Sequence, residues 1–167
     1  MDSGYQNSAR SASRKTIAAM VLSALLYAAC GLAQARAGKI VRVKWVADGD
    51  TVWLLSGEKV RLIGIDAPET HHPVKGAEPF GPEAAEYLRA LVEGKEVFLV
   101  LDQMTKDEYG RTLAYLYLGD LFVNAHLVKE GYARASARKP NLTYEALFIE
   151  LETEACRASK GLWKKSP

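Results

Sequence analysis

The sequence has little cysteine, little histidine and no strong excess of one charge. It contains two cysteines and three histidines among 167 residues, and its formal net charge is +2. So few cysteines exclude a scaffold held together by disulfides and a zinc site built from cysteine clusters. The small net charge excludes a protein drawn to polyanions by its overall field. No internal repeat or low-complexity tract is present, so the composition indicates an ordinary globular chain with one domain.

The first 37 residues have the pattern of an export signal. Three basic residues, Arg10, Arg14 and Lys15, precede an uncharged run over residues 16–35. The strongly apolar part of that run is shorter than the roughly 20 residues that a membrane-spanning helix needs, and small residues that suit signal cleavage follow it. We therefore expect residues 1–37 to be a cleaved signal peptide and the protein to be secreted or periplasmic.

Two other fates of this segment stay open as alternatives. Residues 16–35 would anchor the chain in a membrane if they were retained, and Cys30 would carry a lipid if the signal were of the lipoprotein type. After cleavage, residues 38–167 form a domain with a net charge of about −1 and a single cysteine, Cys156. Such a domain has no internal disulfide and must be held together by packing, so we expect Cys156 to be buried and inert.

Strand-like segments and tight turns alternate between Lys39 and Asp66. The apolar runs over residues 40–46, 52–55 and 60–65 are separated by Asp48-Gly49 and Ser56-Gly57. Dipeptides of this kind favour the short turns of antiparallel hairpins. The pattern therefore predicts three antiparallel strands.

Helical signals begin further along the chain. Residues 67–81 have no hydrophobic period and are predicted to form a long ordered loop, which is a common carrier of function. Pro82 suits the first turn of a helix that Gly94 stops, and Asn124 and Thr143 stand where N-caps would begin two more helices. The expected elements after the loop are a helix over residues 82–93, strands over 97–101 and 113–118, a turn at Gly119-Asp120 that leads into residues 121–123, and helices over 124–130 and 144–160.

This order of elements predicts an α+β domain that is mainly β. Five strands, with one helix after the third and two at the end, fit a small closed or partly open barrel flanked by helices. An open antiparallel sheet with its helices on one face has the same element order and stays an alternative.

Four carboxylates stand at the ends of predicted elements within 22 residues. They are Asp48, Asp50, Asp66 and Glu69. Tight turns fold the strands back on each other, so these side chains can converge, and converging carboxylates repel one another unless a hard cation such as Ca²⁺ lies among them. Asp-Gly is also a simple turn signal, so the pattern alone does not require a metal site.

Two arginines lie in or beside predicted strands. Arg61 stands in an apolar run and Arg111 begins another, and a guanidinium is costly to bury unless it meets a carboxylate or a phosphate. Each is therefore either a partner in an ion pair or a clamp on a ligand. Strict alternation would put Arg61 and Asp66 on opposite faces of one strand, unless a bulge at Gly64 resets the register.

The remaining candidates favour structural roles. The adjacent pair His71-His72 lacks a third neighbouring ligand for a transition metal. Trp45, Trp53, Tyr115 and Tyr117 have ring faces that could stack on bases, but their strand positions predict packing in the barrel.

Several motifs, in order and at matching spacing, resemble the staphylococcal nuclease family. They are Asp48-Gly49-Asp50-Thr51, the ten residues from Arg61 to Thr70, Phe80-Gly81-Pro82-Glu83-Ala84 and Asp107-Glu108-Tyr109-Gly110-Arg111. The segment from Asn124 to Gly131, Lys139-Pro140-Asn141 and Gly161-Leu162-Trp163 extend the likeness over nearly all of residues 39–163.

The resemblance implies a five-stranded OB-fold barrel with three helices that hydrolyses DNA and RNA phosphodiesters with Ca²⁺. It implies that Asp50, Asp66 and the backbone carbonyl of Ala67 bind the ion, with Asp48 close by. It further implies that Arg61, Glu69 and Arg111 are catalytic. In that scheme Glu69 orients or deprotonates the attacking water, and the two arginines hold the phosphate as its charge grows.

The resemblance also implies substrate contacts, some of them altered. Lys75 and Tyr109 match binding positions, whereas Ser136 and Arg138 replace two tyrosines of the family, so base contacts are expected to be weaker and Arg138 to attract phosphate or stack. We expect an exported, Ca²⁺-dependent, sugar-nonspecific endonuclease that acts on DNA and RNA as a monomer without an obligate protein partner. A non-catalytic OB-fold module that binds nucleic acid is the alternative.

Overall fold

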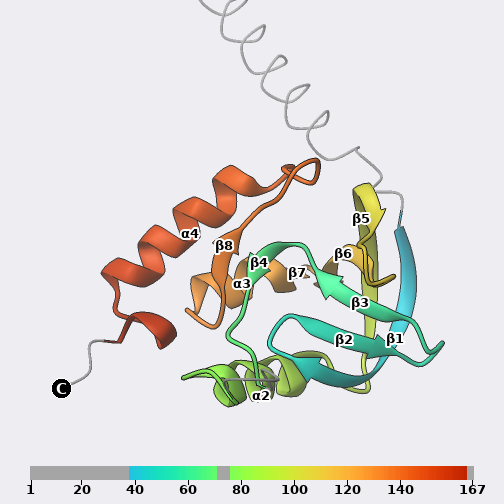
Figure 1. The fold of residues 1–167 in the computed structure, drawn as a ribbon, viewed down its shortest axis with the longest axis horizontal. Coiled ribbons are helices and arrows are strands. Elements are labelled where there is room, and N and C mark those ends of the chain that lie inside the picture. The colour runs from blue at the N-terminus through green and yellow to red at the C-terminus, as the bar shows by residue number, and fades with distance from the viewer. Residues whose placement is uncertain (1–37, 71–75, 165–167) are drawn as a thin grey trace, which may run out of the picture. The chain divides into compact units, whose positions relative to one another are not determined.

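A computed structural model describes residues 38–70 and 76–164 (Figure 1). The predicted signal segment, His71-His72 and Lys75 lie outside the described residues. Within the described ranges, no helix combines the length and the apolar character needed to cross a bilayer.

Five strands close into a barrel. β1 (Gly38–Asp48), β2 (Thr51–Leu54) and β3 (Lys59–Leu62) form the predicted antiparallel meander, and β5 (Glu96–Lys106) and β6 (Thr112–Leu118) form a hairpin that pairs with the other edge of β1. A parallel pairing of β3 with β6 joins the two ends of this sheet. The closed OB-fold type of barrel is therefore confirmed, and the open sheet is excluded.

The third predicted strand is broken into two. It was expected to continue through Ile65, but β3 ends at Leu62 and β4 (Gly64–Asp66) pairs with β8 (Arg134–Ser136) in a separate small sheet. Gly64 has a positive φ of 80°, and a Cβ at this position would overlap the Phe148 ring. The predicted irregularity at Gly64 is thus present, and only glycine suits both its backbone conformation and its close approach to the ring.

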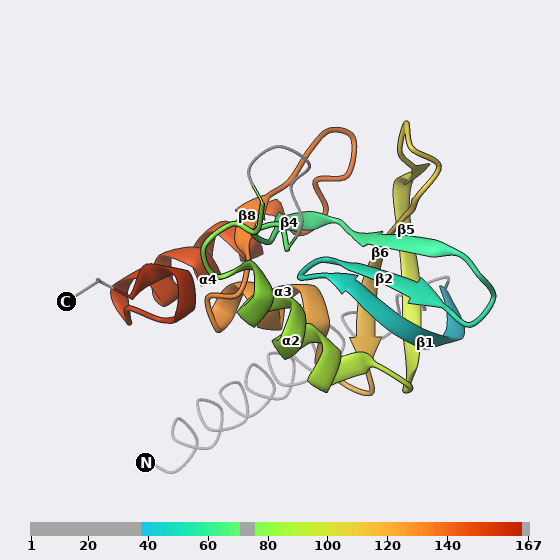
Figure 2. The same ribbon diagram turned by 60° about the horizontal axis from the view of Figure 1, so that its bottom comes forward.

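Three α-helices cover the barrel, as predicted. α2 (Gly81–Val92) packs against β1, while α3 (Val123–Lys129) contacts α4 (Glu145–Arg157) and β6. In both views α4 lies on the side of β4 and β8 that faces away from the barrel (Figure 1, Figure 2). Two further short elements lie in the described part of the chain, β7 (Leu121–Phe122) after β6 and the 3-10 helix η1 (Gly161–Trp163) after α4.

Both predicted side-chain caps are wrong. α3 begins one residue earlier than expected, and the fully buried Asn124 accepts a hydrogen bond from the Leu116 N–H at 3.0 Å and donates one to the Ile63 carbonyl at 2.9 Å. Asn124 therefore supports the break between β3 and β4. Thr143 donates to Asp102 at 3.1 Å, and α4 has no side-chain cap.

One core joins the barrel to the helices. Leu88 of α2, Leu127 of α3 and Phe148 of α4 are all buried against the inward-facing residues of the strands. Two predictions about burial are wrong: Cys156 is an exposed free cysteine on α4, and Trp45 is 43% exposed.

Candidate active site

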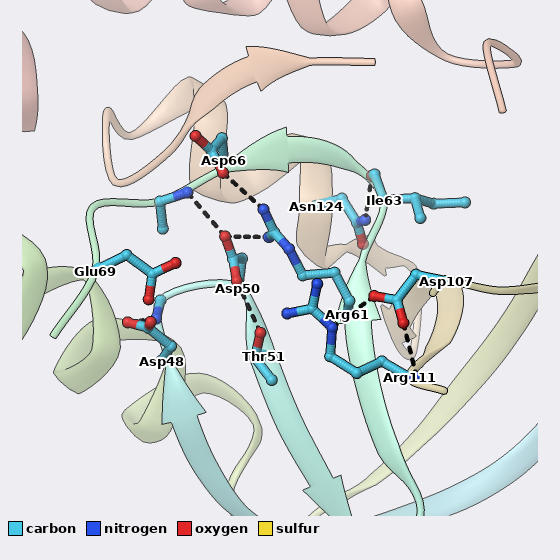
Figure 3. Close-up of polar contacts among 12 residues, drawn as sticks. Asp48, Asp50, Thr51, Arg61, Ile63, Asp66, Glu69, Asp107, Arg111 and Asn124 are labelled. Carbon is cyan, nitrogen blue, oxygen red and sulfur yellow. Dashed lines mark hydrogen bonds and ion pairs between the residues drawn. The ribbon is translucent and has the colours of Figure 1, made fainter. Parts of the chain in front are cut away.

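The outer face of β3 brings Arg61 between two aspartates (Figure 3). Its neighbours Val60 and Leu62 are buried in the core, so Arg61 points to the opposite side. Its guanidinium forms one ion pair with Asp50 through Nη1 and a second with Asp66 through Nη2, at 2.7 Å from Oδ1. The break at Gly64 is what allows Asp66 to meet an arginine that strict alternation would have placed on the other face.

Asp50 is held rigidly beneath this arginine. Its residue is only 5% exposed, its Oδ1 accepts a hydrogen bond from the Thr51 hydroxyl at 2.9 Å, and its Oδ2 accepts one from the Ala67 N–H at 3.0 Å. Burial raises the pKa of Asp50, while Arg61 and the two hydrogen bonds oppose that rise. A buried carboxylate of this kind needs the positive charge beside it.

Glu69 faces Asp48 at the start of the long loop (Figure 3). Asp48 accepts hydrogen bonds on Oδ1 from the Gly49 N–H at 2.9 Å and the Thr70 N–H at 3.1 Å. The hydrogen bond between the Asp48 and Glu69 side chains, together with burial and the charges of Asp48 and Asp50, raises the pKa of Glu69 to about 7.

The backbone around Glu69 is fixed by the next turn of the loop. The Glu69 N–H donates to Glu78 Oε2 at 3.2 Å, and the Glu78 N–H donates back to the Glu69 carbonyl at 2.8 Å. Glu78 was not singled out in the sequence, because a lone glutamate in a polar loop carries no signal.

Arg111 is oriented by Asp107 across the turn that joins β5 to β6. The side-chain Nε of Arg111 donates to Asp107 Oδ2 at 2.6 Å, and the backbone N–H of Arg111 donates to Asp107 Oδ1 at 2.9 Å. The same Oδ1 accepts the Tyr109 N–H at 3.0 Å. With Nε occupied, the end of the guanidinium extends toward Arg61 (Figure 3). Sequence reasoning quoted Asp107 only as part of a motif and missed this positioning role.

A cavity of about 350 Å³ collects half of the predicted site residues, namely Arg61, Asp66, Glu69, Arg111 and Arg138. Its lining combines the two arginines with Asp66 and Glu69 and is extended by basic and polar residues from the end of β8 and the segment that follows it. The residues concerned are Arg61, Asp66, Glu69, Asp107, Arg111, Ser136, Arg138, Lys139 and Asn141. Arg138 therefore lies where a phosphate contact was predicted.

Four predicted residues do not line this cavity. Ala67 is buried beside Asp50, to which its N–H donates. Asp50 lies buried behind Arg61, and Asp48 lies behind Glu69. Tyr109 is 76% exposed beside the cavity, with its ring centroid 5.4 Å from Cζ of Arg111. Lys75 is outside the described residues.

Comparisons with known proteins agree with this arrangement. The family model described as staphylococcal nuclease homologue matches residues 59–165. A thermonuclease of Staphylococcus intermedius is 40% identical over 131 residues, which are 77% of this chain and 78% of that protein. The chain belongs to the staphylococcal nuclease family.

Two further relatives show how much of the chain this family likeness spans. A thermonuclease of Staphylococcus hyicus is 38% identical over 128 residues, covering 75% of this chain and 74% of that protein. An endonuclease of Bacillus subtilis, YncB, is 37% identical over 124 residues, which are 71% of this chain and 59% of that protein. The family model begins at Lys59, so it includes Arg61, Glu69 and Arg111 but not Asp50.

The oxygen donors of this nuclease-family site suit a hard cation such as Ca²⁺. Among residues 38–70 and 76–164, no three histidine, cysteine or acidic side chains cluster tightly enough to bind a metal by themselves. Asp50 and Asp66 are both paired with Arg61. The remaining ligands would have to be carbonyls and water, which Ca²⁺ accepts. The negative charges of Asp48 and Asp50 help to raise the pKa of Glu69, and a cation bound nearby would offset their repulsion.

Proposed function

We propose that this chain is a Ca²⁺-dependent nuclease that hydrolyses the phosphodiester bonds of both DNA and RNA with water as the nucleophile. Membership of the staphylococcal nuclease family and the thermonuclease relatives support the hydrolysis of nucleic acid. The observation that carries the chemistry is that Arg61, Glu69 and Arg111 line one cavity.

The two arginines bind the phosphate. Each guanidinium is planar, stays charged at every working pH and can hold two phosphate oxygens at once. Negative charge on those oxygens grows as water adds to phosphorus, so donors fixed in advance stabilise the transition state more than the bound substrate. Asp107 keeps Arg111 in place for this role.

Glu69 receives the proton of the attacking water. The water oxygen forms a bond to phosphorus while the bond from phosphorus to the leaving sugar oxygen breaks. One water proton moves to the Glu69 carboxylate, and the leaving oxygen takes up a proton from solvent water to become an alcohol. Glu69 suits this role because its carboxylate lines the same cavity as the two arginines that bind the phosphate.

Asp50, Asp66 and the carbonyl of Ala67 would hold the Ca²⁺ ion, with Asp48 close by. A bound Ca²⁺ supplies a further positive charge beside the phosphate. Arg61 pairs with both aspartates, so a bound ion would share their carboxylates with the guanidinium.

The substrate contacts favour phosphate over base or sugar. Arg138 lines the cavity and Tyr109 is exposed beside it, and we assign both, with Lys75, to substrate binding. Contacts of this type carry little sequence information, so a nuclease built on them accepts DNA and RNA. We further propose that the protein is exported and acts as a monomer.

Degradation assays test this function. Purified protein is incubated with plasmid DNA and with a long RNA, first with Ca²⁺ and then with a chelator. We expect both polymers to be degraded with Ca²⁺ and to survive with the chelator. A non-catalytic binding module would retard both polymers in a gel and leave them uncut under either condition.

A further inference from the structure

Two stacked tryptophans lie on the outer face of the barrel. Trp45 of β1 and Trp53 of β2 are cross-strand neighbours whose ring centroids are 5.8 Å apart with an interplanar angle of 15°. A bulge in β1 between Val43 and Trp45 changes the alternation, so Val43 is buried and Trp45 is exposed. Trp45 is 43% exposed, so part of its ring remains open to a ligand.

This pair lies on the same face of the sheet as Arg61. Trp53 is flanked by Val52 and Leu54, which are both buried, so its side chain points outward as that of Arg61 does. The register pairs Trp53 with Lys59, two residues before Arg61 on β3. Residues two apart on a strand lie about 7 Å apart. The outer face therefore runs from Arg61 through Lys59 to the tryptophans without crossing an edge.

Positive charge accompanies the rings. The Lys59 ammonium lies 5.7 Å from the Trp53 ring centroid, and Lys44, beside Trp45 at the bulge, is exposed. The adjacent acid, Glu58, accepts a hydrogen bond from Thr112 and pairs with Lys39. Aromatic faces interleaved with ammonium groups are the usual platform for single-stranded nucleic acid, because bases stack on the rings and phosphates meet the cations.

We propose that Trp45, Trp53, Lys44 and Lys59 form a binding surface for single-stranded nucleic acid that extends from the catalytic cavity. The inference rests on the proposed nuclease function, since it assigns this surface to the same substrate. A single strand is the occupant because its bases expose the ring faces that a duplex keeps stacked.

The surface is tested by binding under conditions that do not depend on cleavage. The affinity of the full chain for a fluorescent 16-residue oligothymidylate is measured with a chelator present, and circular dichroism checks the fold of each variant. We expect Trp45→Ala to weaken binding about tenfold, in line with the loss of one stacked base, and Trp45→Phe to restore most of it.

Lysine variants provide a second measurement. Lys59→Gln should reduce the slope of log affinity against log salt concentration by about 0.7, the value for one phosphate contact on a single strand. Lys129→Gln, which removes an exposed lysine on α3, is the matched control and should leave that slope unchanged.

Defined outcomes overturn the inference. It fails if Trp45→Ala binds the oligonucleotide as tightly as the wild type does. It also fails if sedimentation shows that the tryptophans hold two copies of the chain together and that the oligonucleotide does not separate the copies. If wild-type protein still degrades DNA in either case, the proposed function stands. If the oligonucleotide binds through Trp45 but no polymer is cut with Ca²⁺, the proposed function fails and the binding surface remains.

Discussion

At the scale of the residue, the site depends on how each charged group is held by another. Arg61 forms ion pairs with both Asp50 and Asp66. The Asp107 carboxylate accepts hydrogen bonds from the side chain and from the backbone of Arg111. Such pairs keep guanidinium groups pointing into the cavity before any phosphate arrives, so little reorganisation is needed during the reaction.

Arginine geometry, beyond its charge, should be required at position 111. Arg111→Lys keeps the positive charge but loses the planar fork and the Nε contact to Asp107, so we expect kcat to fall about 100-fold or more. Steady-state kinetics on a short DNA substrate measure this. Asp107→Asn, which keeps the shape of the positioning group, should lower kcat less. Equal activity of Arg111→Lys and wild type would remove Arg111 from the catalytic set.

At the scale of the element, the break between β3 and β4 is what assembles the site. Gly64 takes a positive φ next to Phe148, and Asn124 binds the Ile63 carbonyl just before it. These contacts turn Asp66 back toward Arg61.

Gly64→Ala should therefore damage both stability and activity. The new methyl group meets the Phe148 ring in addition to the strain of a positive φ, so we expect a loss of about 2 to 4 kcal/mol in the free energy of unfolding. Gly57→Ala is the matched control: Gly57 also has a positive φ, but no atom lies near its would-be Cβ, so only about 1 kcal/mol should be lost. Urea denaturation distinguishes the two, and equal losses would show that the approach to Phe148 is unimportant.

The elements that the sequence predicted well are those with a strong local signal. The hairpin turns at Asp48-Gly49 and Ser56-Gly57 and the helix beginning near Pro82 were read from turn and cap chemistry. β8 has only three residues and exists through its pairing with β4, so no local pattern marks it. Asn124 has the chemistry of a cap but satisfies buried backbone groups instead, which only the tertiary structure reveals.

Sequence motifs pointed to part of the candidate site and not to its geometry. The motifs identified Arg61, Glu69 and Arg111, and the structure places all three at one cavity. Arg61 meets Asp66 because the chain passes from one sheet to another at Gly64. Asp107 holds Arg111, and Glu78 binds the backbone of Glu69, through contacts within turns. Such side-chain contacts have no signature in the sequence.

At the scale of the whole molecule, closure of the barrel depends on the seam between β3 and β6. Glu58, in the hairpin before β3, accepts a hydrogen bond from the buried Thr112 of β6 at 2.6 Å and pairs with Lys39 of β1 at 3.1 Å. The Thr112 hydrogen bond and the charge of Lys39 lower the pKa of Glu58 below its ordinary value of 4.5.

This lowered pKa makes part of the stability depend on pH. The contribution is fully present above the unfolded pKa of about 4.5 and is lost as the pH falls through the lower folded pKa. Glu58→Gln should therefore be less stable than wild type at pH 7, and the difference should shrink as the pH falls below 4.5. Urea denaturation of both proteins over a series of falling pH values checks this, and a difference that stays constant over the series would assign the effect to shape instead of charge.

Export is the other prediction at this scale. If residues 1–37 are a cleaved signal peptide, protein recovered outside the cytoplasm should begin near Gly38. Mass spectrometry of the intact secreted protein measures this directly. A full-length product in the membrane fraction would favour retention as an anchor.

The most direct test of the account is the single-turnover rate at which Glu69→Gln cleaves a saturating DNA substrate with Ca²⁺, compared with the wild type. Loss of the group that takes the water proton predicts a rate about 100-fold to 10,000-fold lower, with DNA affinity in chelator and unfolding free energy close to wild type. Cleavage by Glu69→Gln at the wild-type rate would contradict the assignment of Glu69, and with it the proposed chemistry of the cavity.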